Sequence, residues 1–307
     1  MKQCFDKIYD ELCKAASKEN IVLNEPMSRH TSFHIGGPAA AFVTPSDKDE
    51  LCRTVACCKN NNIKYFILGN GSNILVSDKG FDGVIINTSK SLISLSVDED
   101  RIYADAGVLL SKISSAALAN KLAGFEFASG IPGTLGGAIV MNAGAYGGEM
   151  KDVVVSVNAY DPDTNSIVEM SSDELKFGYR TSAFKGLDHV VLDVCLRLKS
   201  GDPVEIKNKI DELKAMRTSK QPLNYPSAGS AFKRPKDNFA GKLIMDAGLS
   251  GFSIGDAAVS KKHCGFFVNL GNATASDMKK LFDEVISRVD EKFNVLLEPE
   301  VCFLGEF

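Results

Sequence analysis

The chain has 307 residues, of which 44% are hydrophobic and 24% are charged, and its formal net charge is -4 at pH 7. This composition is that of an ordinary globular protein with enough residues for two or three domains, and it excludes disordered and collagen-like proteins. No block of like charge dominates any region, which argues against a nucleic-acid partner.

The N-terminal residues and the cysteines indicate the cellular compartment. Residues 1–20 carry an acidic, amphipathic pattern typical of a helix rather than of a signal peptide. No apolar run approaches the roughly 18 residues that a membrane-spanning helix needs, so we expect no membrane association. The eight cysteines form no CxxC pair and no Cys/His ligand cluster. We therefore expect a cytoplasmic protein with reduced thiols and no metal site.

The first part of the chain predicts a small α/β domain. Residues 26–37 have no regular pattern, and a helix is expected to begin at Asp47, where Glu50 has the spacing of a capping box. Short apolar runs predict three strands, at residues 63–68, 74–76 and 84–86. We assign residues 1–91 to this domain.

A different pattern follows residue 91. The sequence predicts strands at 92–97, 101–106, 153–160, 167–170 and 190–198 and a helix at 111–122. Between them lies a glycine-rich stretch, and Asp161-Pro162-Asp163 has the chemistry of a turn between strands. We assign residues 92–200 to a second, α+β domain.

The third part begins at Ser200–Pro203, which combines a linker with a helix start. Asp202 is the expected N-cap, Pro203 fits the first turn, and Glu205 completes a capping box. Further helices are predicted at 239–247, which Gly248 ends, and at 276–293. We assign residues 201–301 to a third, α+β domain and expect residues 302–307 to return to the first.

Two glycine-rich segments could bind a ligand. Gly69-Asn70-Gly71-Ser72-Asn73 joins two predicted strands, and its amides could converge on an anion, although a plain hairpin would use the same residues. The stretch from Gly130 to Gly148 is dense enough in glycine to admit a flat, extended ligand at its backbone, or it is a cluster of turns. It lacks the Lys and Ser/Thr of a P-loop and the context of a dinucleotide-binding motif, which disfavours a classical Rossmann domain.

These motifs together resemble a known family. The carriers are Thr31–Gly37, Leu68–Leu75, Gly130–Glu149, Phe177–Arg180, Tyr225–Lys233 and Leu297–Val301. They are similar to the FAD-binding module of the vanillyl-alcohol oxidase type and, more narrowly, to the UDP-N-acetylenolpyruvoylglucosamine reductases of bacterial peptidoglycan synthesis. The segments cover nearly the whole chain in the family's order.

The resemblance implies a fold and a reaction. The fold is α+β, with a two-subdomain FAD-binding module followed by a C-terminal substrate-binding domain. The reaction is a relay in which NADPH reduces non-covalently held FAD and the flavin then reduces the enolpyruvyl ether of UDP-N-acetylglucosamine to UDP-N-acetylmuramate. His34 is therefore not expected as a covalent anchor. The FAD contacts implied by the matching motifs are Gly69, Asn70, Gly71, Ser72, Asn73, Pro132, Gly133, Thr134, Gly136, Gly137, Asn142 and Ala145.

The resemblance also implies catalytic and substrate-binding residues. Arg180 matches the cation that grips the substrate carboxylate, Ser230 matches the proton donor, and Glu300 matches the group that polarises the enolpyruvate together with the arginine. Taken alone, Arg180 could be an ordinary surface arginine, Ser230 a turn serine and Glu300 a solvated carboxylate. Candidate contacts to the sugar nucleotide are Tyr179, Lys220, Arg217 and Arg234.

Further sequence features bear on the family subtype and on the alternative functions. The short spacing between Ser230 and Glu300 resembles the second, shorter subtype of the family, which lacks the tyrosine lid loop. We expect a monomer with alternating, ping-pong turnover. The alternatives are an FAD-dependent oxidase of the same fold and a catalytically inactive flavin- or nucleotide-binding regulator, but the combination of Arg180, Ser230 and Glu300 disfavours both.

Overall fold

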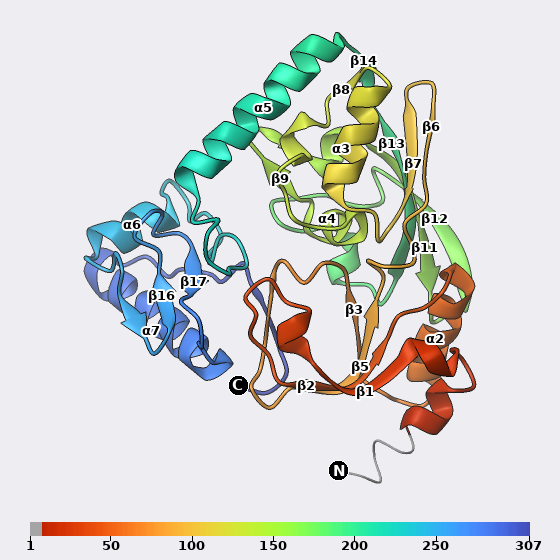
Figure 1. Cartoon of the computed structure of the whole chain (residues 1–307), viewed down its shortest axis with the longest axis horizontal. Coiled ribbons are helices and arrows are strands. Elements are labelled where there is room, and N and C mark those ends of the chain that lie inside the picture. The colour runs from red at the N-terminus through yellow and green to blue at the C-terminus, as the bar shows by residue number, and fades with distance from the viewer. Residues whose placement is uncertain (1–7) are drawn as a thin grey trace. The chain divides into compact units, whose positions relative to one another are not determined.

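The structure, a computed structural model, describes residues 8–307 (Figure 1). Two compact units are present. Unit one holds residues 41–70 and 83–217 with the described part of the first 23 residues, and unit two holds residues 24–40, 71–82 and 218–307. The expected N-terminal helix is present at residues 8–12, and its first part lies outside the described residues.

A four-stranded sheet contains two strands that the sequence did not predict. Its order is β1-β2-β5-β3, and β3 pairs in parallel with β5. The strands are β1 (Ile21–Pro26), β2 (Pro38–Val43), β3 (Tyr65–Leu68) and β5 (Phe81–Asn87). In β1 three consecutive residues are exposed, so it lacks an alternating pattern, and β2 contains three consecutive alanines, which have low strand propensity. For these reasons the sequence pattern predicts neither strand.

Helix α2 (Lys48–Asn60) begins where the sequence predicted, with Asp47 as its N-cap. The Asp47 carboxylate accepts from the Glu50 amide at 2.7 Å, as expected. The expected capping box is wrong in its other half, because the Glu50 carboxylate accepts from the amides of Ser46 and Ser17 and from the Asn20 side chain. Glu50 thus joins the start of α2 to the segment that precedes β1.

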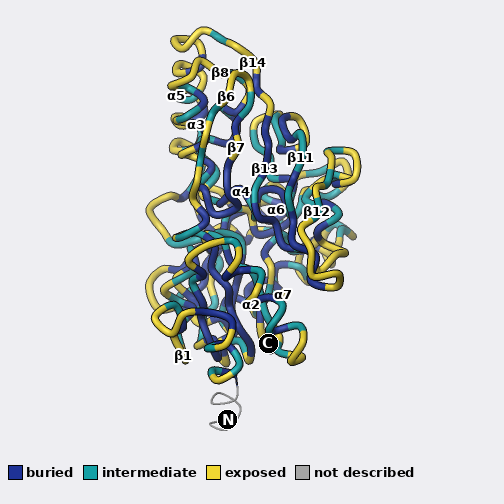
Figure 2. Tube along the Cα trace, turned by 90° about the vertical axis from the view of Figure 1, so that its right-hand side faces the viewer, coloured by how far each residue is buried: buried dark blue, intermediate teal, exposed yellow. Residues whose placement is uncertain are grey.

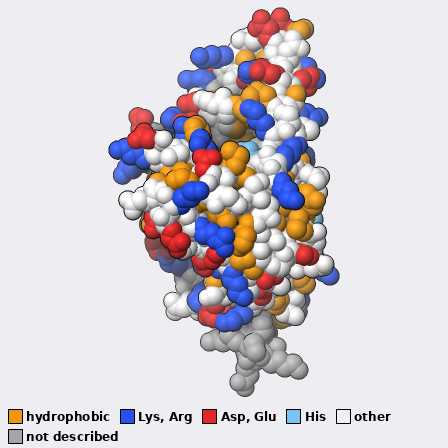
Figure 3. Space-filling view, turned by 90° about the vertical axis from the view of Figure 1, so that its left-hand side faces the viewer, with side chains coloured by type: hydrophobic (Ala, Val, Ile, Leu, Met, Phe, Trp, Pro, Cys, Tyr) orange, Lys and Arg blue, Asp and Glu red, His pale blue; other side chains and the backbone are white. Residues whose placement is uncertain are grey.

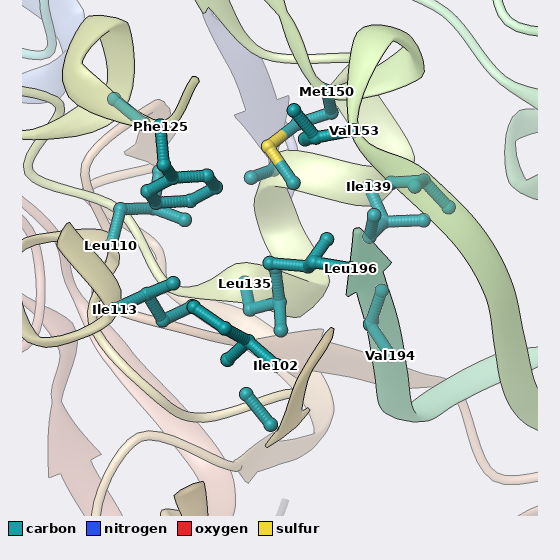
Figure 4. Packing of buried hydrophobic residues seen from close by; sticks show 14 of the residues in the cluster. Ile102, Leu110, Ile113, Phe125, Leu135, Ile139, Met150, Val153, Val194 and Leu196 are labelled. Carbon is teal, nitrogen blue, oxygen red and sulfur yellow. The ribbon is translucent and has the colours of Figure 1, made fainter. Parts of the chain in front are cut away.

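The core of unit one lies between a sheet and two helices. The antiparallel order is β12-β11-β13-β7-β6. Its strands are β6 (Leu95–Asp98), β7 (Arg101–Asp105), β11 (Val154–Asp161), β12 (Ser166–Ser171) and β13 (Val190–Arg197). The helices are α3 (Leu110–Ala119) and α4 (Leu135–Met141). In Figure 4, side chains of α4 lie beside Val194 and Leu196 of β13, and burial of this apolar surface stabilises the unit.

Two predictions for unit one need correction. The helix expected at 111–122 ends at Ala119, and Leu122–Ala123 forms β8, which pairs with β14 (Lys199–Ser200). The glycine stretch, for which the sequence indicated a ligand-binding backbone or a cluster of turns, contains α4 and the short strands β9 (Gly144–Ala145) and β10 (Gly148–Glu149). A Cβ on Gly136 would lie 2.9 Å from the Ala106 Cβ, so this glycine serves close packing of the helix.

Unit two is built around α7. The long helix α7 (Ala275–Phe293) carries a capping box between Thr274 and Asp277, and its buried face packs with the sheet β15-β16-β17. The remaining elements are α6 (Ala240–Asp246), β15 (Ser253–Ile254), β16 (Ala257–Val259), β17 (Phe267–Asn269) and β18 (Cys302–Leu304), which pairs in parallel with β4 (Ile74–Val76). The helices expected near 239–247 and 276–293 are therefore confirmed.

Helix α5 (Pro203–Lys220) carries the chain from one unit to the other. The Asp202 carboxylate accepts from the Val204 amide at 2.8 Å, which confirms Asp202 as the cap. Only Ile206 and Leu213 of this helix are buried, and Figure 2 shows α5 largely exposed while β7 and β13 are largely buried. Among residues 8–307, no helix is long and apolar enough to cross a bilayer.

Candidate active site

The loop at residues 69–73 has amides available for a ligand. Within the described residues, the amides of Asn70, Gly71, Ser72 and Asn73 donate to no protein acceptor. Gly71 has φ +60°, and a Cβ there would lie 1.9 Å from the His30 carbonyl oxygen, so only glycine fits. Successive free amides in such a turn form a concave donor surface suited to an anion.

The start of this loop is fixed within unit one. The Asn70 side chain donates to the Pro132 carbonyl at 2.7 Å, and the Asn87 side chain donates to the Gly69 carbonyl at 3.0 Å. A Cβ on Gly69 would lie 2.2 Å from the Thr134 Oγ1. The structure therefore brings Gly69 and Asn70 together with the predicted contacts Pro132 and Thr134.

The glycines after Thr134 do not all face the same surroundings. A Cβ on Gly148 would lie 2.7 Å from the Phe127 ring, and Gly136 is tightly packed as described. At Gly147 a Cβ would meet nothing within 4 Å, and at Gly137 it would meet only the Thr134 Oγ1, at 3.8 Å. Gly137 and Gly147 therefore leave room for a ligand, whereas Gly136 and Gly148 serve packing.

Asn142 departs most from its expected role. Its exposed fraction is 0%, and its side chain is fully used within unit one. The amide nitrogen donates to the Gly178 carbonyl and to the Glu149 carboxylate, and the side-chain oxygen accepts from the Lys151 amide. In this structure the Asn142 side chain has no surface for a cofactor.

Arg180 lies in a strained turn. Its φ is +54°, in the left-handed region that long side chains rarely adopt. The turn is closed by bonds between the Gly178 and Thr181 backbones, at 3.0 Å and 3.3 Å. The guanidinium lies 5.1 Å from the Tyr179 ring centroid, and its Nη2 donates to the Gly144 carbonyl at 3.4 Å. Such strain persists where the surroundings impose it, often at functional sites.

Arg217 is a second cation of unit one. It is half-buried against Gly130, where a Cβ would lie 3.1 Å from the Arg217 Cδ. Burial lowers the pKa of the guanidinium, and no carboxylate of residues 8–307 forms an ion pair with it. A half-buried cation without an acidic partner is suited to an anionic ligand.

Ser230 of unit two lies in an extended segment between two others. Ser230 forms an antiparallel bridge with Phe266, and the Ala231 amide donates to the Gly265 carbonyl at 2.8 Å. On the other side, the Glu300 amide donates to the Ala231 carbonyl at 2.9 Å. Ser230 is exposed and follows Gly229, whose φ is +79°. The structure thus places the two predicted residues Ser230 and Glu300 on neighbouring backbones.

The carbonyl of Glu300 is fixed as well. The Asn73 side chain donates to it at 3.1 Å, so the second half of the glycine loop is tied to the segment that carries Glu300. Glu300 is half-buried, and the neighbouring Glu298 pairs with Lys233 at 2.9 Å. Asn73 therefore has a positioning contact that the sequence did not indicate.

Unit two carries the cationic candidates Lys220 and Arg234 and the further cation Lys262. Arg234 lies over the Phe239 ring, 4.1 Å from its centroid, and the exposed Lys262 donates to the Thr218 carbonyl, two residues before Lys220. The His263 Nδ1 accepts from the Gly265 amide at 3.1 Å, which leaves the ring proton of the neutral form on Nε2. Figure 3 shows positive side chains interspersed with acidic and hydrophobic ones on one face of the molecule.

The predicted site residues are divided between the units. Tyr179, Arg180 and Arg217 belong to unit one, and Lys220, Ser230, Arg234 and Glu300 belong to unit two. Lys262 and His263 of unit two were not among the predicted site residues. A bonding role for Asn142 was also missed, although an asparagine directly after a helix is a recognisable C-cap signal.

Comparisons with known proteins give the family. Residues 221–304 match the model of the UDP-N-acetylenolpyruvoylglucosamine reductase C-terminal domain, and residues 38–171 match that of an FAD binding domain. The UDP-N-acetylenolpyruvoylglucosamine reductase of Caldanaerobacter subterraneus is 52% identical, over 97% of this chain and 98% of that protein. The Clostridioides difficile protein of the same name is 48% identical, over 97% of this chain and 98% of that protein.

A solved structure gives the same result. The crystal structure of UDP-N-acetylenolpyruvylglucosamine reductase from Thermus caldophilus matches with a TM-score of 0.77 and 34% identity, over 93% of this chain and 98% of that one. The match confirms the expected α+β fold with an FAD-binding module.

Proposed function

Because the chain belongs to the UDP-N-acetylenolpyruvoylglucosamine reductase family, we propose that it reduces the enolpyruvyl ether of UDP-N-acetylglucosamine to UDP-N-acetylmuramate, with NADPH as the hydride donor. It is an FAD-dependent oxidoreductase of peptidoglycan precursor synthesis. The observation that carries this proposal is the 52% identity to a named reductase over 97% of the chain.

The residues present fit FAD as a non-covalent cofactor. Four free amides at residues 70–73 suit its diphosphate, and the open positions at Gly137 and Gly147 leave room beside the glycine-rich backbone. Bound FAD supplies the hydride carrier between NADPH and the enolpyruvyl group. We propose that Gly133 and Ala145 also contact the cofactor through their backbones.

Arg180 is proposed to hold the substrate carboxylate. Hydride addition to the methylene carbon leaves negative charge on the neighbouring carbon, and conjugation spreads it to the carboxylate. A guanidinium can bind that carboxylate through two parallel hydrogen bonds and stabilises it more strongly as the charge grows. The contact with the Tyr179 ring supports a defined direction for this side chain.

Ser230 is proposed to give the proton. The carbon beside the ether oxygen must be protonated after hydride addition, and the Oγ proton of Ser230 is the source. The residues on either side, Gly229 and Ala231, are small, and Ser230 is exposed, so the hydroxyl is approachable. A carbanion is basic enough to draw a proton from a hydroxyl group, which is otherwise a weak acid.

Glu300 and four further residues are proposed to bind the substrate. Glu300 polarises the enolpyruvyl group together with Arg180. Tyr179, Arg217, Lys220 and Arg234 contact the sugar nucleotide, and the unpaired guanidinium of Arg217 suits its diphosphate. FAD is proposed to be held by two domains, residues 1–91 with 302–307 and residues 92–200. The substrate is proposed to be bound by residues 201–301.

The proposed reaction gives the protein a role in cell-wall synthesis. We propose a cytoplasmic monomer whose product is needed for cell-wall growth, and thus for cell shape and division. Light scattering after gel filtration would test the monomer. Depletion of the protein should give rounded, lysing cells.

An anaerobic absorbance experiment tests the proposed function. The purified protein is loaded with FAD, NADPH is added, and then the enolpyruvyl UDP-sugar. We expect NADPH to bleach the flavin bands and the sugar nucleotide to restore them. A protein that takes up no FAD, or whose bleached bands return only with oxygen, would contradict the proposal.

A further inference from the structure

The turn that carries Arg180 is held from both sides by buried side chains. At residues 178–182 the chain places Arg180 at φ +54°, although only two backbone bonds close the turn itself. An arginine has no intrinsic preference for this conformation. The conformation must therefore be imposed by contacts outside the turn.

Asn142 holds the beginning of the turn. It is the left-handed C-cap of α4, with φ +43°, and its side-chain nitrogen donates to the Gly178 carbonyl at 3.0 Å. The same nitrogen donates to the Glu149 carboxylate, and its oxygen accepts from the Lys151 amide at 3.0 Å. These bonds fix the orientation of the amide, so its donor toward Gly178 cannot rotate away without breaking them.

Ser182 holds the end of the turn. Its exposed fraction is 5%, and its hydroxyl donates to the Val140 carbonyl of α4 at 2.9 Å. Val140 and Asn142 both belong to the C-terminal end of α4. One end of a single helix therefore anchors both ends of the turn.

The guanidinium is directed toward the same part of unit one. Its Nη2 donates to the carbonyl of Gly144, two residues after Asn142, and the Lys185 ammonium donates to the Arg180 carbonyl at 2.6 Å. The turn that carries Arg180 is thus restrained by the side chains of Asn142, Ser182 and Lys185.

We propose that Asn142 and Ser182 are positioning residues, which hold the turn 178–182 in the conformation that presents the Arg180 guanidinium to the substrate carboxylate. The inference rests on the role proposed above for Arg180. It replaces the expected role of Asn142 as a cofactor contact, because a fully buried and fully bonded amide has no surface for a ligand. Catalysis depends steeply on such placement, since a displacement of about 1 Å can cost about 100-fold in rate.

Two variants test the proposal without changing Arg180. Asn142→Gly keeps a residue that tolerates positive φ but removes the amide, and Ser182→Ala removes the hydroxyl. In both we expect reoxidation of the reduced enzyme by the enolpyruvyl UDP-sugar to slow by about 10- to 100-fold, since guanidinium placement is impaired. FAD reduction by NADPH should stay within about twofold, because a positioning residue for Arg180 has no part in it.

A matched control and a second readout separate positioning from general damage. Asn294→Gly removes another left-handed C-cap asparagine, with φ +54°, from α7, where it makes no bond to the turn. This variant should leave both half-reactions unchanged. Amide hydrogen exchange over residues 178–182 should speed up in Asn142→Gly and Ser182→Ala but not in Asn294→Gly.

A double-mutant cycle with Arg180→Ala decides between the outcomes. Either substitution should add less than about twofold to the loss already caused by Arg180→Ala, because the positioning residues act only through that side chain. Full additivity, or an equal fall in both half-reactions, would overturn the inference. If Arg180→Ala itself reacts normally with the sugar nucleotide, the proposed function of Arg180 fails instead. Should Asn142→Gly not fold, Ser182→Ala carries the same test alone.

Discussion

Arg180 and Ser230 are held in place by different means. Arg180 lies in a left-handed turn whose ends are bonded by the buried side chains of Asn142 and Ser182. Ser230 lies in an extended segment that exchanges backbone bonds with its neighbours at Gly265 and Glu300, and its special requirement is the positive φ of Gly229. The first arrangement depends on particular side chains, whereas the second depends on backbone pairing and one glycine.

The difference decides which substitutions should disturb each residue. A turn held by side chains is sensitive to polar substitutions remote from the substrate, because each removes a bond that no other group replaces. Backbone pairing tolerates most side chains, because every non-proline residue supplies the same donor and acceptor. Functional damage around Ser230 should therefore concentrate at Ser230 itself and at Gly229.

The largest effect is expected from Ser230→Ala. Removing the proposed proton donor should slow reoxidation of the reduced enzyme by the enolpyruvyl UDP-sugar by about 10²- to 10⁴-fold, the usual range for a general acid. FAD reduction by NADPH should be unchanged, since that step needs no protein proton donor. Stopped-flow absorbance of the flavin measures both steps. Ser253→Ala, at an exposed position of β15 in the same unit, is the control. An equal loss in both steps would indicate damage to the fold.

A smaller effect is expected from Arg180→Lys. The substitution keeps the charge but removes the planar fork, so about 10²-fold should be lost in the step with the sugar nucleotide. Arg197→Lys, at an exposed position whose ion pair with Asp100 is 3.6 Å long, should change neither step. Near-normal turnover of the Arg180 variant would remove the basis for a bidentate carboxylate contact.

Sequence periodicity identified the elements that have one buried face. Helix α7 and the paired strands β11 and β13 lie close to where their apolar patterns predict them. Strands β1 and β2 were not predicted, since their patterns do not alternate. Helix α4 was not predicted because glycines normally disfavour helices. The first of those glycines, Gly136, is explained by its tertiary contact with Ala106, whereas a Cβ on Gly137 would meet only the Thr134 Oγ1, at 3.8 Å.

The site was predictable as a set of residue types in a family-like order, but not as a set of contacts. Asn142 illustrates the limit, because the motif that contains it indicates a ligand-binding segment. Only the fold brings Gly178 and Glu149 to its side chain, and neither pairing follows from spacing along the chain.

Glu50 is another buried polar side chain that bonds to backbone groups, but no catalytic residue lies beside it. Its exposed fraction is 2%, and although burial alone would raise the pKa, the amides of Ser46 and Ser17 and the Asn20 side chain lower it to about 2. Glu50→Gln replaces one acceptor with a donor that faces these donors, so we expect a loss of about 1–3 kcal/mol in the free energy of unfolding. Both half-reactions should remain normal.

The pH dependence of stability gives an independent check on Glu50. Because its pKa is lower in the folded than in the unfolded protein, its contribution is complete above about pH 4.5 and is lost as the pH falls toward 2. Urea unfolding of the wild type should therefore show a steeper fall in stability across this range than unfolding of Glu50→Gln. Parallel curves for the two proteins would show that the buried carboxylate does not have the stabilising role assigned to it.

The smallest effects come from a matched pair of glycines, and they bear most directly on the contrast between the two regions. Gly229 and Gly147 have φ values of +79° and +91°, and a Cβ at either position would meet nothing within 4 Å. Alanine should therefore cost each only backbone strain, about 1 kcal/mol, and lower the melting temperature of both variants alike. If backbone pairing places Ser230, only Gly229→Ala should also slow the step with the sugar nucleotide, by a few-fold. Gly147→Ala should instead weaken FAD retention, measured by dialysis. A variant pair with identical kinetics and identical FAD affinity would contradict this division of roles.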